Sequence, residues 1–128
     1  MTARSFVDTN ILFYALSDGE IDKRHIANHL LNDLARPVIN GQVIRELGYT
    51  LRNKAGYAEY ALLEIIRQLY VDCEVMPDQE AVFLHASQLR MEMSISYWDS
   101  LIVAAALLAG CDTLYSEDMQ HGQVIAST

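Results

Sequence analysis

The sequence has few cysteines, and they do not form a recognisable motif. Cys73 and Cys111 are its two cysteines, and they lie far apart in the chain, so neither belongs to a C-x-x-C pair. Zinc and redox motifs need cysteines at close and fixed spacing. We therefore expect two reduced, buried thiols and no zinc or redox centre.

Basic residues are also scarce. The chain has 9 lysines and arginines against 17 aspartates and glutamates, which gives a net charge of −8 at pH 7. A protein that coats nucleic acid by electrostatics alone has the opposite balance. An enzyme whose carboxylates hold cations is not excluded, because a bound Mg²⁺ reverses the field where a phosphate would lie.

Long apolar runs and several enzyme motifs are absent. The longest apolar run covers residues 101–109, which is shorter than the ~18 residues that span a bilayer. The first residues, MTARSFVD, contain no signal-peptide h-region, so we expect a cytoplasmic protein without a membrane segment. Neither G-x-S-x-G nor G-x-x-x-x-G-K-[ST] occurs, which argues against a serine hydrolase with that motif and against a P-loop nucleotide site.

The sequence does contain short apolar segments that alternate with helical patterns. A length of 128 residues suits one domain over residues 1–128. The patterns predict strands at residues 5–9, 37–40, 73–77 and 113–116, and helices from residue 10 and over 22–35, 41–54, 57–71, 79–93 and 97–110. Such alternation favours an α/β fold, a three-layer α/β/α sandwich with a central parallel sheet covered on both faces.

Two aspartates follow predicted strands of this sheet. Asp8 lies between two apolar segments, where a lone carboxylate is costly unless its charge is used. Asp118 follows the fourth strand by two residues, although it could also be a turn residue. Ligands of parallel sheets bind at the carboxyl ends of the strands. If the first and fourth strands are neighbours, both carboxylates open into one crevice.

Two further acids lie on predicted helices. Glu46 falls at the flank of the apolar stripe of its helix, where it could reach over the sheet edge or simply be solvated. Asp99 begins the most apolar helix, and its S-x-x-D spacing from Ser96 is also that of a helix cap. If the four acids converged, they would repel one another. Mg²⁺ or Mn²⁺, which prefer oxygen ligands, would remove that repulsion.

The segments FVDTNIL, RE, YWDSLIVAAAL and LYSEDMQHG, in this order and spacing, resemble the PIN-domain ribonucleases. The resemblance covers essentially the whole chain and is greatest to the VapC-type toxins of bacterial toxin–antitoxin pairs. It implies an acidic quartet that holds Mg²⁺ or Mn²⁺, formed by Asp8, Glu46, Asp99 and Asp118. It also implies that Asn10 and Ser116 hold the carboxylates and a metal-bound water in place.

The activity that the resemblance implies is metal-dependent cleavage of single-stranded or looped RNA. Water activated by the metal would attack the phosphorus, as in other metal-assisted hydrolyses, and leave 5′-phosphate and 3′-hydroxyl ends.

One departure from the family pattern concerns the last strand. In similar chains the segment after MQHG continues as an apolar strand, whereas here it reads QVIAST. We expect this edge strand to be short or missing.

Substrate and partner contacts are predicted from weaker patterns. Arg45, Arg52 and Lys54 share one segment and could bind the phosphates of an RNA backbone. They could equally well lie on a solvent-exposed helix face without a ligand. His121 lies close to Asp118 in the sequence and could contact a phosphate.

The apolar surface of the helices at 57–71 and 101–109 predicts a homodimer. The resemblance also implies a small antitoxin-like protein, which would insert an apolar segment into a helix groove and a basic side chain among the acids.

Two alternatives to a ribonuclease remain open at this point. The same acids could serve a structure-specific DNA nuclease, which cleavage of matched RNA and DNA oligonucleotides would separate from a ribonuclease. The fold could also be a non-catalytic PIN-like binding module. The four acids argue against such a module, since a docking surface has no need of clustered carboxylates.

Overall fold

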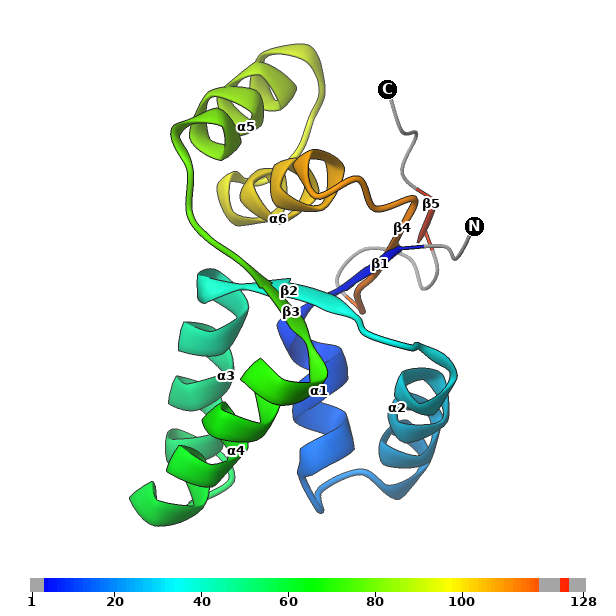
Figure 1. The fold of residues 1–128 in the computed structure, drawn as a ribbon, viewed down its shortest axis with the longest axis vertical. Coiled ribbons are helices and arrows are strands. Elements are labelled where there is room, and N and C mark those ends of the chain that lie inside the picture. Colours follow the sequence, from blue (N-terminus) through cyan, green and yellow to red (C-terminus); the bar gives the residue numbers. More distant parts are fainter. Residues whose placement is uncertain (1–3, 118–122, 125–128) are drawn as a thin grey trace.

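The structure is a computed structural model and describes residues 4–117 and 123–124. Helices cover both faces of one sheet: α5 and α6 lie on one side, and α1 to α4 on the other (Figure 1). The predicted three-layer sandwich is therefore confirmed. The elements, in chain order, are β1 (Ser5–Val7), α1 (Thr9–Leu16), α2 (Ile21–Asp33), β2 (Val38–Asn40), α3 (Gly41–Asn53), α4 (Glu59–Asp72), β3 (Glu74–Met76), α5 (Glu80–Glu92), α6 (Tyr97–Leu108), β4 (Thr113–Tyr115) and β5 (Gln123–Val124).

The sheet has the order β3-β2-β1-β4-β5, so β1 is its central strand. Strands β1 to β4 pair in parallel, with Phe6 opposite Val38 and Leu114. The fifth strand has two residues and pairs antiparallel to β4. The central parallel sheet is as predicted, and the last edge strand is short. Because β1 and β4 are neighbours, the condition set for a shared crevice at their carboxyl ends is met.

The first strand is shorter than the sequence predicted. It ends at Val7, and α1 begins at Thr9, so the predicted strand at residues 5–9 is two residues too long. The reason is local: the carboxylate of Asp8 accepts a hydrogen bond from the backbone N–H of Thr9 and caps the helix. Carboxylates are favoured at this position because the first N–H groups of a helix have no partner within it.

The apolar helix α6 is covered within the chain itself. Ile102, Ala104 and Ala106 are buried, because α6 packs on α5 and faces the sheet. Residues 101–109 therefore leave less apolar surface for a second copy than the sequence suggested, with Leu108 43% exposed, and the homodimer stays a prediction. None of the helices over the described residues is both long and apolar enough to cross a membrane.

Both cysteines are buried and free. Burial raises the pKa of each thiol to about 11, because the thiolate would lose its hydration. The expectation of two reduced, buried thiols is confirmed.

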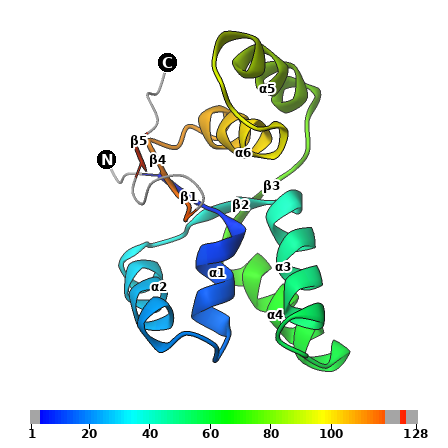
Figure 2. The ribbon, with the colours of Figure 1, turned by 180° about the vertical axis from the view of Figure 1, so that it is seen from behind.

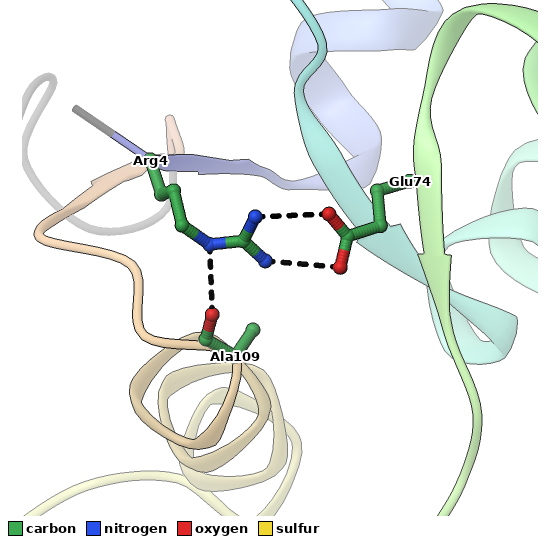
Figure 3. Close-up of polar contacts among 3 residues, drawn as sticks. All are labelled: Arg4, Glu74 and Ala109. Carbon is green, nitrogen blue, oxygen red and sulfur yellow. Dashed lines mark hydrogen bonds and ion pairs between the residues drawn. The ribbon is translucent and has the colours of Figure 1, made fainter. Parts of the chain in front are cut away.

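Arg4 joins three elements at the amino end of the sheet (Figure 3). Its guanidinium donates two parallel hydrogen bonds of 2.9 and 3.0 Å to the carboxylate of Glu74, at the start of β3. Its Nε donates a third, of 2.9 Å, to the carbonyl of Ala109 at the end of α6. The hydrogen bonds from Arg4 hold the pKa of Glu74 below its ordinary value of 4.5. This one side chain thus ties the sheet to the helix layer above it.

We expect Arg4→Gln to lower the free energy of unfolding by about 1 kcal/mol at pH 7, since paired charges that are partly exposed contribute little more than this. The pKa of Glu74 is depressed in the folded state, so this stabilisation is present above its unfolded pKa and disappears as the pH falls through the folded one. Urea unfolding at pH 7 and pH 3 measures both effects. The control is Arg67→Gln, which breaks a more exposed pair with Glu64. Equal losses in the two variants at pH 7 would contradict a role for the Arg4 contacts.

Candidate active site

Three of the predicted acids come from elements that start or end at one edge of the sheet. Asp8 directly follows β1, and Glu46 lies on α3, which directly follows β2. Figure 2 shows α1 and α3 leaving the sheet on the same side. Asp99 lies in the first turn of α6, which runs back towards the start of β4 and so begins at the carboxyl edge. The topology thus places all three at the edge where parallel sheets bind ligands.

Asp8 is the most tightly held of these acids. It is 6% exposed. One carboxylate oxygen accepts a hydrogen bond of 2.7 Å from the backbone N–H of Thr9. The other accepts a hydrogen bond of 2.9 Å from the hydroxyl of Ser116, a fully buried residue that follows β4. The structure therefore places Ser116 against a carboxylate, as predicted, while its role towards a metal stays a prediction.

Glu46 is connected to Asp8 through Thr9. The hydroxyl of Thr9 donates a hydrogen bond of 3.2 Å to one carboxylate oxygen of Glu46, while its backbone N–H binds Asp8. The amide of Gln42, one turn earlier on α3, donates to the other oxygen of Glu46 at 3.1 Å. Sequence reasoning missed both Thr9 and Gln42. The i, i+4 spacing of Gln42 and Glu46 was the available signal for one of them.

Asp99 is half-buried, and its backbone N–H donates to the hydroxyl of Ser96 at 3.0 Å. The helix cap suggested by the S-x-x-D spacing is therefore present. The cap uses the backbone of Asp99 and not its carboxylate, so it does not compete with a role in metal binding. Asn10, the other predicted supporting residue, lies in the first turn of α1 and is half-buried.

The segment that leads towards Asp118 is tethered to the first two helices. Glu117, which follows Ser116, accepts a hydrogen bond of 2.6 Å from the hydroxyl of Tyr14 on α1. Lys23 of α2 forms an ion pair of 3.0 Å with the same carboxylate. The hydrogen bond to Glu117 raises the pKa of Tyr14. These contacts connect Glu117, two residues beyond β4, to the second half of α1 and the start of α2.

The quartet as a whole is not tested by the structure. Asp118 and His121 lie outside the described residues. Among residues 4–117, no three side chains of histidine, cysteine, aspartate or glutamate are close enough to hold one ion. The donor chemistry nevertheless fits a hard cation, because all the candidate side chains offer carboxylate oxygens. Asp8 in particular is a buried carboxylate already oriented by two donors.

The predicted basic residues are divided along α3. Arg45 is exposed beside Glu46, and its guanidinium lies 3.8 Å from the carboxylate of Asp78. Arg52 lies in the last turn of α3 and Lys54 directly after it. Arg52 donates to the carbonyl of Tyr57 at 2.6 Å. The structure therefore brings Arg45 to the acids and leaves Arg52 and Lys54 at the opposite end of the helix.

A cleft of about 650 Å³ opens beside the acids, between the start of α3, α5 and the start of α6. It contains one predicted acid and one predicted basic residue, Glu46 and Arg45. Its other walls are mostly apolar and aromatic. The lining residues are Asn40, Gln42, Arg45, Glu46, Asp78, Val82, Phe83, Tyr97, Trp98 and Leu101.

Comparisons with known proteins agree with this architecture. A structure of VapC20 from Mycobacterium tuberculosis, described as a Sarcin-Ricin loop cleaving toxin, has a TM-score of 0.72 and 17% identity and covers 88% of each chain. A toxin–antitoxin complex from Klebsiella pneumoniae has a TM-score of 0.67 and 19% identity, over 88% of this chain and 84% of the other. Among curated proteins no sequence matches. The family model of the PIN domain matches residues 5–124, and the chain therefore belongs to the PIN-domain family.

Proposed function

We propose that this protein is a cytoplasmic endoribonuclease that depends on Mg²⁺ or Mn²⁺, cleaves single-stranded or looped RNA, and acts as the toxin of a toxin–antitoxin pair. The observation that carries the proposal is the placement of Asp8. A buried carboxylate at the end of the central strand accepts hydrogen bonds from Thr9 and Ser116 and is joined through Thr9 to a second acid, Glu46. VapC20, which shares the fold, is described as a Sarcin-Ricin loop cleaving toxin.

The proposed roles follow from the contacts. Asp8, Glu46, Asp99 and Asp118 would hold the cation, which when bound supplies an activated water and stabilises the charge that develops on the phosphate. Ser116 fixes one oxygen of Asp8, and Thr9 orients Asp8 and Glu46 together. Gln42 holds the second oxygen of Glu46. Such neighbours of metal ligands set the direction of the ligand oxygens.

The test is cleavage of a labelled RNA stem-loop, the same loop sequence as a linear strand, and the DNA copies of both. We expect Mn²⁺-dependent cleavage of the RNA within the loop or the linear strand, with 5′-phosphate ends, and no cleavage in excess chelator. Preferential cleavage of the DNA copies would favour the structure-specific DNA nuclease. If purified protein binds no metal and cleaves none of the four substrates, the binding module is the better account.

The hydroxyl of Thr9 provides a narrower test. Thr9→Val removes the donor to Glu46 but keeps the backbone N–H that caps α1 through Asp8. Changes to residues that orient metal ligands lower metal affinity by about 10-fold or more. We expect the Mn²⁺ concentration for half-maximal cleavage to rise by about 10-fold. Thr9→Ser, which keeps a hydroxyl, should have the same half-maximal Mn²⁺ concentration as wild type. If Thr9→Val and Thr9→Ser have the same half-maximal Mn²⁺ concentration, the hydroxyl of Thr9 does not orient Glu46 for metal binding.

The proposed partner is a small antitoxin-like protein. The structure of the Klebsiella pneumoniae relative is a toxin–antitoxin complex, and this chain has a groove of about 770 Å³ between α1, α2 and α4. Its walls include apolar side chains that could receive an apolar segment: Leu12, Leu16, Leu31, Leu34, Ile65 and Leu69. Pro37 and Cys73 directly precede β2 and β3, so this groove extends to the amino edge of the sheet. A basic side chain that competes with the cation at the carboxyl edge would therefore come from another part of the partner than the segment in the groove. Growth arrest on expression, relieved by a protein encoded beside this one, is the expected result.

The homodimer also stays a proposal. With α6 covered, it now depends on the exposed apolar side chains of α4, which are Tyr60, Leu63, Tyr70 and Val71. Exposed apolar patches often mark interfaces. Sedimentation at tens of micromolar is the measurement, and a purely monomeric profile would contradict it.

A further inference from the structure

The cleft beside the acids exposes aromatic rings that the proposed chemistry does not use. Phe83 of α5 is 50% exposed, and Tyr97 and Trp98 of α6 are 54% and 63% exposed. All three line the cleft together with Leu101. Large rings that gather on an exposed surface usually mark a binding site. A sequence pattern that is apolar almost throughout α6 gave no sign that its first two residues would lie in solvent.

The two rings of α6 are held in a fixed arrangement. The guanidinium of Arg90 lies 4.5 Å from the centre of the Tyr97 ring and donates a hydrogen bond of 2.6 Å to the hydroxyl of Ser100. Tyr97 in turn meets Trp98 edge to face, with the ring centres 5.2 Å apart at 85°. Arg90 therefore orients Tyr97, and Tyr97 limits the positions open to Trp98. An aromatic side chain that is already held in its binding position loses less conformational entropy when the ligand binds.

The cleft is continuous with the candidate active site. Glu46 belongs to both, and Asp99 directly follows Trp98 in the chain. Among the described residues, Arg45, next to Glu46, is the lining residue with a positive charge. Its guanidinium lies 3.8 Å from the carboxylate of Asp78, and both side chains of this ion pair are partly exposed to solvent. Two acids, Glu46 and Asp78, share the walls with it. A ligand with flat apolar faces and one phosphate near Arg45 fits this combination better than an extended anion.

We infer that this cleft binds an unpaired nucleobase of the RNA, stacked on Trp98, with the neighbouring phosphate against Arg45. The inference rests on the proposed ribonuclease function and adds to it a substrate site. Bases stack on exposed aromatic rings with little dependence on sequence, because every base has a flat face. A base inside a duplex already stacks on its neighbours and cannot enter the cleft. The cleft therefore selects single strands and loops.

The charge of the walls gives the inference a measurable consequence. Binding to single strands weakens with salt by a slope of about 0.7 for each phosphate neutralised. Since Arg45 is the one cation among the described residues that line the cleft, we expect log affinity to fall with log salt with a slope of about −0.7. A protein that held RNA through a basic face would show a much steeper slope.

Trp98 makes the test direct, because it is the chain's single tryptophan. The Asp8→Asn protein in Mg²⁺ is titrated with a single-stranded RNA hexamer and, separately, with a duplex of the same composition. We expect the hexamer to quench the fluorescence of Trp98 and the duplex to leave it unchanged. Fluorescence that changes with protein concentration, and that RNA does not alter, would show that a second copy covers the cleft and would overturn the inference.

Cleavage kinetics give the second readout. Trp98→Leu and Phe83→Leu, on different helices, should each raise KM for the linear RNA by about 10-fold with little change in kcat, whereas Trp98→Phe keeps a ring and should lie within about 3-fold of wild type. Tyr49→Leu, which changes an exposed tyrosine of α3 that does not line the cleft, is the matched control. If wild type cleaves RNA and both leucine variants keep its KM, the base site is wrong and the proposed function stands. If wild type neither binds nor cleaves RNA, the proposed ribonuclease function is contradicted, and the base site with it.

Discussion

Asp8→Asn should lower the rate of RNA cleavage by about 1000-fold and leave the folded protein intact. Loss of a metal ligand removes several kcal/mol of transition-state stabilisation, and each 1.4 kcal/mol is about tenfold in rate. Asparagine keeps an oxygen that can accept from the N–H of Thr9, and its amide can donate to the hydroxyl of Ser116. Asparagine and aspartate cap helices about equally well. The substitution thus removes the charge and little else.

Without metal, removal of this charge should not destabilise the protein. In the proposed site the acids repel one another when no cation is bound, so Asp8→Asn should leave the free energy of unfolding unchanged or raise it. A buried acid that served only as a partner of a buried cation would behave in the opposite way and cost about 3–5 kcal/mol. Urea unfolding in chelator distinguishes the two. Asp33→Asn, an exposed acid of α2, is the control for loss of charge alone.

The second large effect concerns metal binding. Mn²⁺ at about 100 times its dissociation constant stabilises a protein by ~2.7 kcal/mol, which for a chain of this size corresponds to about 10 °C in melting temperature. We expect a rise of this order for wild type and Asp33→Asn. Asp8→Asn and Glu46→Gln should gain much less. Thermal melts with chelator and with Mn²⁺ provide the measurement, and an equal gain in all four proteins would show that the cation binds elsewhere.

The layers of the fold could be predicted from sequence because each strand is a short apolar run between helical patterns. β1 and β2 are buried throughout, so Phe6 with Val7 and Val38 with Ile39 form continuous apolar pairs instead of alternating with exposed polar residues. The end of β1 could not be predicted to the residue, since Asp8, which directly follows the strand, is the cap of α1. The backbone of Asp8 is extended in either case, and the helical turn begins only at Thr9, which the local composition does not specify.

The candidate acids could be named from the sequence, and their role stays a prediction, but the hydrogen bonds that connect them could not be predicted. The hydrogen bond from Thr9 to Glu46 joins residues 37 positions apart, and it exists only because β1 and β2 are neighbours in the sheet. No local pattern around Thr9 contains that information. The covering of α6 could not be predicted for the same reason, because an apolar helix looks alike in sequence whether α5 or a second copy packs on it.

The measurement that tests the central claim most directly is the sequencing of RNA 5′ ends from cells that express this chain, beside cells that express Asp8→Asn at the same level. We predict that wild type produces a discrete set of new 5′-phosphate ends within unpaired RNA, and that Asp8→Asn produces none of them. The same new ends in both samples, or no new ends from soluble wild-type protein, would contradict the proposal that Asp8 belongs to the active site of a ribonuclease.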